Sequence, residues 1–179
     1  PDVITKADRV ILPGVGAFAN GMLALKSLGL IEVIKGIAAD GIPLLGICLG
    51  MQLLLDESEE HGLTKGLGII PGRVVPVPNL NPDGLPLKIP HIGWSSLIAH
   101  ESATWDGTVL QNLSTGDAVY FVHSFMAVPQ DPTMRIADCL YGVNQISAVV
   151  SRNNVIGCQF HPEKSGKIGI KIIQNFSLL

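Results

Sequence analysis

The sequence predicts an α/β domain with a mixed, mostly parallel central sheet. In the first third of the chain, short apolar runs rich in β-branched residues alternate with segments of helical periodicity. That order builds βαβ units, whose parallel strands are covered on both faces. In the second half, strand-like runs follow one another and are separated by turns of Gly, Pro, Asn and Asp. Such spacing favours antiparallel pairing, so the sheet is expected to be mixed.

The composition limits the classes of protein that fit. The chain has 179 residues, of which 47% are apolar and 15% charged, and this balance favours one folded domain over a disordered chain. The net charge of −3, without a dense cluster of Lys or Arg, gives no reason to expect nucleic acid or a membrane as partner. The longest apolar stretch, residues 42–55, is too short to span a bilayer. Three cysteines at irregular spacings, and a polar start without a signal peptide, favour a reduced, cytoplasmic location.

The first elements are a strand and a helix. Residues 9–13 are expected to form a buried strand that ends in a turn-rich loop at Pro13-Gly14-Val15-Gly16. Asn20 is expected to cap the following helix, in which apolar residues recur every three positions: Met22, Leu25 and Leu28. This pattern predicts the first βα unit.

A second helix and a second βα unit follow. The helix places three apolar residues on one face and ends at Gly41: Leu30, Ile34 and Ile37. Residues 42–47 are the next strand, and it continues directly into a helix predicted over residues 49–60 that ends near His61. The acidic run in that helix, residues 56–60, is interpreted as a solvated helix end.

The second half is predicted to contain five strands and a closing helix. The strands are expected at residues 73–77, 118–127, 136–141, 148–152 and 155–160. Asn153-Asn154 is a hairpin signal between the last two. A proline-rich surface loop is expected at residues 76–90, and apolar residues four apart predict the closing amphipathic helix: Ile168, Ile172 and Phe176.

One glycine-flanked cysteine is a candidate nucleophile. Cys48 stands in Gly46-Ile-Cys-Leu-Gly50, at the predicted junction of a strand and a helix. A sharp turn there lifts the side chain out of the sheet, as in a nucleophile elbow with Cys in place of Ser. The helix N-terminus favours the thiolate, and the Leu49 N–H points to where an oxyanion would form. The alternative is an inert buried cysteine, and this motif alone does not decide between the two.

A candidate base and its orienting group lie near the C-terminus. His161 follows a predicted strand, and Pro162 favours an extended conformation for it. Glu163 then points to the same side and can hold the imidazole, although it can equally serve as a first-turn acidic residue of the last helix. The other histidines are less persuasive: His61 is expected at a helix end, His91 and His100 without a partner, and His123 in the core or in a pocket.

The remaining polar groups suggest no second site. Cys139 and Cys158 alternate with apolar residues in strands and are interpreted as structural. The carboxylates of residues 56–60 are not interpreted as a general-acid pair. No spacing of His, Cys and Asp predicts a metal site.

Four separated motifs together resemble the class I (triad) glutamine amidotransferases. They occur at residues 13–18 (PGVGAF), 46–52 (GICLGMQ), 120–125 (YFVHSF) and 159–165 (QFHPEKS). Together the four motifs span nearly the whole chain, and the resemblance implies a three-layer, flavodoxin-like fold. Residues 13–18 and 91–95 (HIGWS) are most similar to the glutaminase subunits of imidazole glycerol phosphate synthases.

The resemblance implies roles for particular residues. Cys48 would attack the carboxamide of glutamine, with His161 as base and Glu163 as its orienting group. The backbone N–H of Leu49 and of the loop around Val15 and Gly16 would bind the oxyanion. Three further positions would hold the glutamine: Gln52, Ser124 and Phe125. No organic cofactor or metal is implied.

The resemblance also implies a partner. Ammonia released from glutamine would pass through a channel to a (β/α)₈-barrel cyclase that forms a heterodimer with this subunit in histidine biosynthesis. The family usually begins with a further strand and helix, so residues 1–179 are expected to be a single amidotransferase domain that lacks them. The alternatives are a glutaminase of another synthase, a related cysteine hydrolase, and a binding module without catalytic activity.

Overall fold

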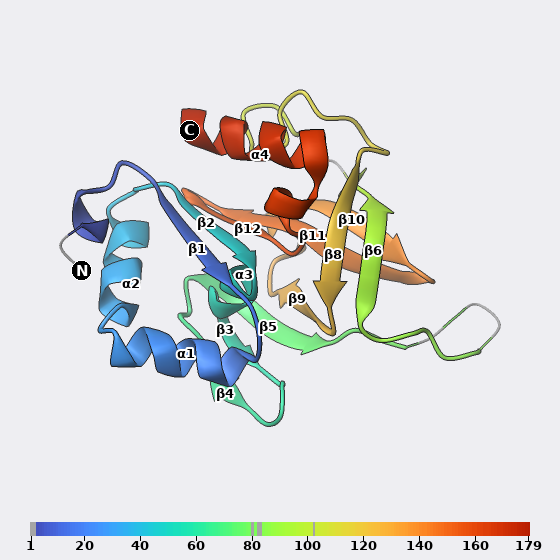
Figure 1. The fold of residues 1–179 in the computed structure, drawn as a ribbon, viewed down its shortest axis with the longest axis horizontal. Helices are drawn as coiled ribbons and strands as arrows, with labels where there is room; N and C mark the ends of the chain where they lie inside the picture. The colour runs from blue at the N-terminus through green and yellow to red at the C-terminus, as the bar shows by residue number, and fades with distance from the viewer. Residues whose placement is uncertain (1–2, 80, 82–83, 102) are drawn as a thin grey trace.

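The structure is a computed structural model that describes residues 3–79, 81, 84–101 and 103–179 (Figure 1). Its main sheet has six strands in the order β1-β2-β12-β11-β10-β7. The strands are β1 (Val10–Gly14), β2 (Leu44–Cys48), β12 (Val155–Cys158), β11 (Asn144–Arg152), β10 (Arg135–Tyr141) and β7 (Ile98–Ala99). Strands β1, β2 and β12 pair in parallel, and the other pairings are antiparallel. The mixed sheet is therefore confirmed, with more antiparallel pairing than the sequence indicated.

Two smaller sheets complete the β structure. One has the strand order β4-β3-β5-β9, and the other is the antiparallel pair β6-β8. Their strands are β3 (Leu55–Ser58), β4 (Thr64–Lys65), β5 (Ile70–Pro76), β6 (His91–Ser96), β8 (Ala118–His123) and β9 (Phe125–Pro129).

The helices lie on both sides of the main sheet. They are α1 (Phe18–Ser27), α2 (Ile31–Ala39), α3 (Leu49–Leu53) and α4 (Gly166–Leu178), with 3₁₀ turns at η1 (Ile4–Lys6), η2 (Pro132–Met134) and η3 (Pro162–Lys164). In Figure 1, α4 crosses above the sheet while α1 and α2 lie beside β1. None of the described helices is long and apolar enough to cross a membrane.

Alternating residues of the central strands separate two hydrophobic layers. Leu45 and Ile156 belong to a cluster with Phe176 of α4, whereas Leu44 and Val155 belong to a second cluster that includes residues of α1, α2 and α3. Successive side chains of a strand point to opposite faces, so one sheet separates two cores. This arrangement confirms the three-layer expectation.

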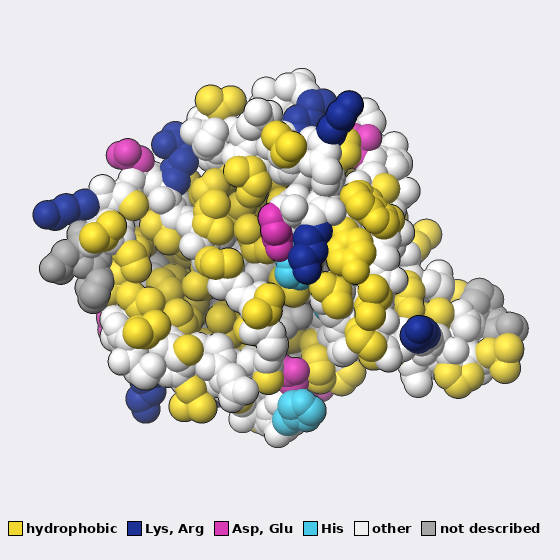
Figure 2. Space-filling view, viewed as in Figure 1, with side chains coloured by type: hydrophobic (Ala, Val, Ile, Leu, Met, Phe, Trp, Pro, Cys, Tyr) yellow, Lys and Arg dark blue, Asp and Glu magenta, His cyan; other side chains and the backbone are white. Residues whose placement is uncertain are grey.

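The edge of this sheet at β1 is apolar. Among the described strands β1 pairs only with β2, and Ile11 is 42% exposed. Figure 2 shows apolar side chains gathered over β1 and α2 on this face. The expectation of a further strand and helix concerns residues outside the sequence and stays a prediction.

Two local predictions in the first half are wrong. Helix α1 starts after Ala17, so Asn20 lies inside the helix and is not its cap. The N–H of Phe18 instead donates to a carboxylate oxygen of Glu60 at 2.6 Å, so a distant side chain caps the helix. The helix after Cys48 ends at Leu53, and the acidic segment predicted to extend it contains strand β3.

The acidic strand is stabilised by contacts with its neighbours. Asp56 accepts from the N–H of Gly72, and Glu57 pairs with Lys65 across β3 and β4. These cross-strand partners are distant in sequence, which is why local periodicity missed them. His61 accordingly lies in the loop between β3 and β4 and not at a helix end.

In the second half, one predicted strand is divided into two, and two strands form that were not predicted. The strand expected at residues 118–127 is broken at Ser124 into β8 and β9, which belong to different sheets. Strands β6 and β7 form where no strand was expected. The hairpin at Asn153-Asn154 is confirmed, since Arg152 pairs with Val155. Residues 80, 82 and 83 of the expected loop lie outside the described residues.

Candidate active site

The backbone around Cys48 has the predicted elbow geometry. Cys48 is the last residue of β2 and directly precedes α3, with φ 53° and ψ −110°, a region that non-glycine residues rarely adopt. The flanking glycines are required by close contacts. A Cβ on Gly50 would lie 1.8 Å from the carbonyl oxygen of Leu12, and one on Gly46 would lie 2.7 Å from the nitrogen of Met51. Glycine therefore permits the tight packing of β1, β2 and α3 that presents the cysteine.

The surroundings of the sulfur favour the neutral thiol. Burial raises the pKa of Cys48 to about 11, whereas a hydrogen bond from the Leu49 N–H lowers it. Among the charged neighbours, Glu163 raises this pKa and Lys164 lowers it. The expectation that a helix N-terminus would favour the thiolate is thus outweighed by burial, and α3 spans only Leu49–Leu53. A base is needed to form the nucleophile.

His161 and Glu163 form the predicted pair. The distance from His161 Nδ1 to Glu163 Oε1 is 2.6 Å. His161 is 3% exposed, while the Glu163 side chain is 55% exposed. Because Nδ1 donates to the carboxylate, Nε2 is the nitrogen left to act on a neighbouring group. The backbone N–H of His161 donates to Tyr120 O, which ties this turn to β8.

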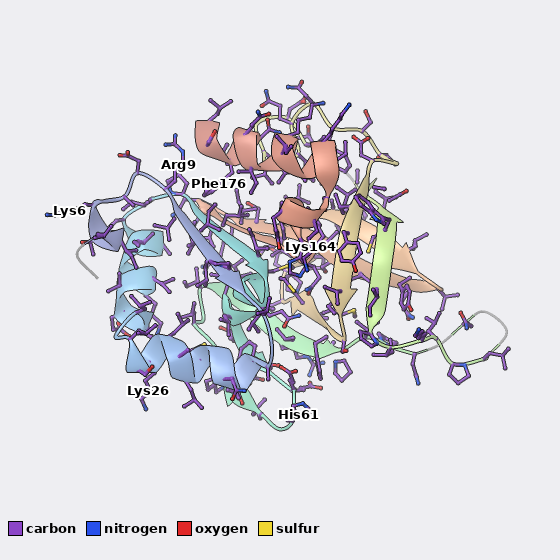
Figure 3. All side chains as sticks on the ribbon, in the orientation of Figure 1. Lys6, Arg9, Lys26, His61, Lys164 and Phe176 are labelled. Carbon is purple, nitrogen blue, oxygen red and sulfur yellow. The ribbon has the colours of Figure 1, made fainter. Side chains whose placement is uncertain are left out.

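A pocket of about 360 Å³ brings most of the predicted residues together. Its lining includes eight of the nine site residues expected from sequence: Val15, Gly16, Cys48, Leu49, Gln52, Ser124, Phe125 and His161. Glu163 contacts this site through His161. Lys164, which is labelled in Figure 3, also lines the pocket and lies near β8, below α4.

The loop between β1 and α1 leaves its backbone accessible at the pocket. Val15 is 81% exposed, and Gly16 has φ 91° with no atom within 4 Å of a Cβ built on it. Only glycine adopts such a conformation readily. The arrangement leaves room for a substrate oxygen to approach the backbone.

Glu60 is a pocket residue that the sequence did not reveal. It lines the same pocket, and one of its oxygens, Oε2, accepts from Phe18 N. Its interpretation as part of a solvated helix end is wrong, because the chain turns back after β3. The acidic run gave no signal that distinguished Glu60 from Glu59, whose carboxylate pairs with Arg73 at the surface.

Two amide side chains connect the pocket wall to the sulfur. Gln52 Nε2 lies 3.0 Å from Phe125 O and 3.1 Å from Gln159 Oε1. Gln159 Nε2 in turn lies 3.9 Å from Cys48 Sγ. Gln159 was part of a recognised motif, but sequence reasoning gave it no role.

Two buried histidines support the turn between β8 and β9. His123 Nδ1 donates to Phe125 O at 2.9 Å, and its Nε2 lies 3.0 Å from His91 Nδ1. His91 Nε2 meets the hydroxyl of Ser95 at 2.9 Å. Burial lowers the pKa of both histidines to about 4, so they are neutral near pH 7. The expectation that His91 lacks a partner is wrong, and His123 is a pocket residue.

The other candidate groups stay outside the site. Cys139 and Cys158 are fully buried in the core, and burial raises the pKa of the Cys139 thiol to about 12 and that of Cys158 further. Within the described part of the chain, no group of three or more His, Cys, Asp or Glu could hold a metal ion. The need for a cofactor stays a matter of prediction.

Known proteins match this chain over nearly its whole length. The family model for "Glutamine amidotransferase class-I" matches residues 3–178. A relative from Legionella pneumophila (strain Lens), named "Imidazole glycerol phosphate synthase subunit HisH 1", is 54% identical over 98% of this chain and 83% of its own length. A relative from Geobacillus sp. (strain WCH70), "Imidazole glycerol phosphate synthase subunit HisH", is 48% identical over 99% of this chain and 81% of its own length.

A solved structure supports the fold. The chain described as "Crystal structure of glutamine amidotransferase" matches with a TM-score of 0.65 over 95% of this chain and 79% of that one, at 16% identity. Such low identity shows the fold alone, and the family follows from the sequence matches. The chain belongs to the class I glutamine amidotransferases, and it is a glutaminase-type enzyme of that family.

Proposed function

We propose that this chain is the glutaminase subunit of an imidazole glycerol phosphate synthase, in which it hydrolyses glutamine to glutamate and ammonia. The main support is the pocket that joins the Cys48 thiol to the His161–Glu163 pair. Relatives at 46–54% identity carry the name of this subunit. The same residues would serve a glutaminase of another synthase, which is the second candidate.

The chemistry begins with a proton transfer. His161 Nε2 takes the proton of the Cys48 thiol, and the sulfur attacks the carboxamide carbon of glutamine. The N–H of Leu49, with backbone N–H groups near Val15 and Gly16, stabilises the negative oxygen of the tetrahedral intermediate. Glu163 stabilises the imidazolium and keeps its Nδ1 protonated.

The second half of the reaction regenerates the thiol. The imidazolium gives its proton to the leaving nitrogen, the C–N bond breaks, and ammonia departs from a glutamyl thioester. His161 then removes a proton from water, which attacks the thioester carbon and forms a second tetrahedral intermediate. Cleavage of the C–S bond releases glutamate, and the sulfur recovers the proton from His161.

Glu60 is proposed to select a free amino acid as substrate. Its Oε2 is held by Phe18 N, which leaves Oε1 for the α-ammonium group of glutamine. Glu60→Gln keeps an oxygen for Phe18 but removes the charge, so KM for glutamine should rise roughly tenfold with a smaller change in kcat. Glu59→Gln is the matched control, and equal kinetics of the two variants would contradict this role.

A synthase partner is proposed to cover the pocket. Ammonia released into water is lost, so a channel to a (β/α)₈-barrel cyclase would make the reaction productive. The pair β6-β8 carries exposed Ile92 and Trp94, at 54% and 57% exposure, next to pocket-lining residues of β8. Figure 2 shows apolar side chains over this part of the face, the kind of surface that a partner covers. The cytoplasm is the proposed location, and no cofactor is proposed.

Ammonia release from glutamine, with and without the cyclase and its nucleotide substrate, tests this function. We expect turnover that the cyclase stimulates strongly, and that Cys48→Ala abolishes. Cys139→Ala is the control, because that thiol lies in the core. Turnover indifferent to the cyclase would favour a glutaminase of another synthase, and turnover retained in Cys48→Ala would exclude the mechanism.

A further inference from the structure

The geometry points to Gln159 as a donor that stabilises the reacting sulfur of Cys48, in an orientation imposed by Gln52. The inference deepens the proposed function, because it concerns how the nucleophile is formed. Gln159 lies two residues before His161, directly after β12, and its side chain is fully buried. Its backbone N–H donates to Ala148 O, so strand β11 fixes the position from which the side chain extends.

The contacts of Gln52 determine which way the Gln159 amide faces. An amide oxygen and nitrogen have nearly the same shape, so partners must assign them. Phe125 O only accepts, hence the Gln52 atom 3.0 Å away is its NH₂ group. That same nitrogen lies 3.1 Å from Gln159, which must therefore present its oxygen there. The NH₂ group of Gln159 is left facing Cys48 Sγ at 3.9 Å.

This donor matters when the thiol ionises. In the neutral state the S–H can donate to Val122 O, which lies 3.9 Å from the sulfur. After the proton leaves, that carbonyl oxygen faces a negative sulfur without a hydrogen bond and opposes the charge. The NH₂ of Gln159 still faces the sulfur at 3.9 Å, and in a buried environment a donor stabilises a negative charge more than it would in water. Gln159 therefore offsets part of the burial that disfavours the thiolate.

Other charged and titratable groups act on the same sulfur, and they set the background of any test. Glu163 opposes and Lys164 favours the thiolate, both from η3. His161, Glu60 and His123 also line the pocket that contains Cys48. Variants of Gln159 leave all five of these groups in place, so a change in thiol reactivity measures the amide itself.

The test is the rate at which iodoacetamide alkylates Cys48 in the full chain, measured across about pH 6 to 9, where only the thiolate reacts. Gln159→Met keeps the length of the side chain but removes the donor, and the alkylation rate at a given pH should fall roughly tenfold. Gln159→Glu still accepts from Gln52 but directs an oxygen at the sulfur, so the fall should be at least as large. Cys48→Ala gives the background from other thiols.

The control separates reactivity from stability. Ile146→Val removes one buried methylene-sized group on β11 and leaves Gln159 intact. Thermal melts identify conditions in which all variants stay folded, and alkylation is compared there. Slower alkylation in both Gln159 variants, with normal alkylation in Ile146→Val, supports the inference. An unchanged rate in either Gln159 variant overturns it, and so does equal slowing in Ile146→Val.

The alkylation requires neither glutamine nor a partner subunit. If the unaltered chain showed no glutamine hydrolysis but the Gln159 variants still alkylated slowly, the proposed function would fail and the inference would stand. If hydrolysis were normal and alkylation indifferent to Gln159, the inference alone would fail.

Discussion

The molecule contains two histidine–carboxylate pairs with the same geometry and different surroundings. In each pair a histidine Nδ1 lies 2.6 Å from a carboxylate oxygen: His161 with Glu163, and His100 with Asp138. The Glu163 side chain is 55% exposed at the rim of the pocket, whereas Asp138 is fully buried. Asp138 also accepts from Arg135 and Gln145, so both of its oxygens are engaged.

The difference lies in what the second nitrogen of each histidine can reach. The pocket around His161 is also lined by Cys48, by Leu49 of α3, and by Val15 and Gly16 of the loop between β1 and α1. The hollow beside His100 is lined by Arg135, Pro132 and neighbouring residues, and no cysteine lines it within the described chain. The proposed catalytic role of the His161–Glu163 pair therefore depends on the neighbouring cysteine, whereas the His100–Asp138 pair is expected to contribute to stability alone.

The largest contrast is expected from removing each histidine. His161→Ala should lower kcat/KM for glutamine by roughly 10³-fold or more, because the base that forms the thiolate is lost. His100→Ala should leave kcat/KM per folded molecule near that of the unaltered chain, while lowering the melting temperature. Steady-state ammonia release and thermal melts of both variants measure this. A similar loss of activity in His100→Ala would show that the two pairs are coupled.

Removing each carboxylate should reverse the order of the effects, because the free energy of unfolding should fall more when Asp138 is removed than when Glu163 is removed. Asp138→Ala leaves Arg135 and His100, whose side chains are 21% and 10% exposed, without their acceptor. The free energy of unfolding should fall by about 3–5 kcal/mol, as for other broken buried pairs. Glu163→Ala removes a half-exposed partner and should cost less than about 1 kcal/mol, although it lowers kcat. Urea unfolding of the two variants compares them, and equal destabilisation would contradict the distinction.

The sequence marked the candidate residues Cys48, His161 and Glu163 partly through local signals, and the resemblance to the family favoured their catalytic interpretation over the inert one. Cys48 stands between two glycines that the elbow requires, and Glu163 follows His161 by two residues. The contacts that sequence reasoning missed join residues far apart in the chain. His91 and His123 are 32 positions apart, His100 and Asp138 are 38 apart, and Gln159 is 111 from Cys48.

The fold shows the same division between local and distant causes. Strands with clear apolar runs, such as β2 and β12, were predicted, as was the hairpin before β12. Strand β3 was predicted as helix because its acidic sequence lacks a strand pattern, and only pairing with β4 and β5 makes it a strand. Tertiary contacts override such local preferences.

A third pair, His91 with His123, contains no carboxylate and extends the comparison to pH. Burial lowers the pKa of both groups to about 4 from an ordinary value of 6.5. Above pH 6.5 neither the folded nor the unfolded chain protonates them, so stability has its full value. Between about pH 6.5 and 4 the unfolded chain binds protons that the folded chain does not bind. The free energy of unfolding therefore falls as the pH falls.

The expected slope is at most about 1.4 kcal/mol per pH unit for each of these histidines. Urea unfolding at several pH values between 7 and 4 measures it, and replacing both residues by Gln should flatten the curve. His61→Asn is the matched control, since that exposed side chain has a backbone φ of 53° that Asn tolerates. If the doubly substituted chain kept the full slope, the acid sensitivity would have to come from other groups. A flattened slope would instead show that the His91–His123 pair is stable only while both imidazoles are uncharged.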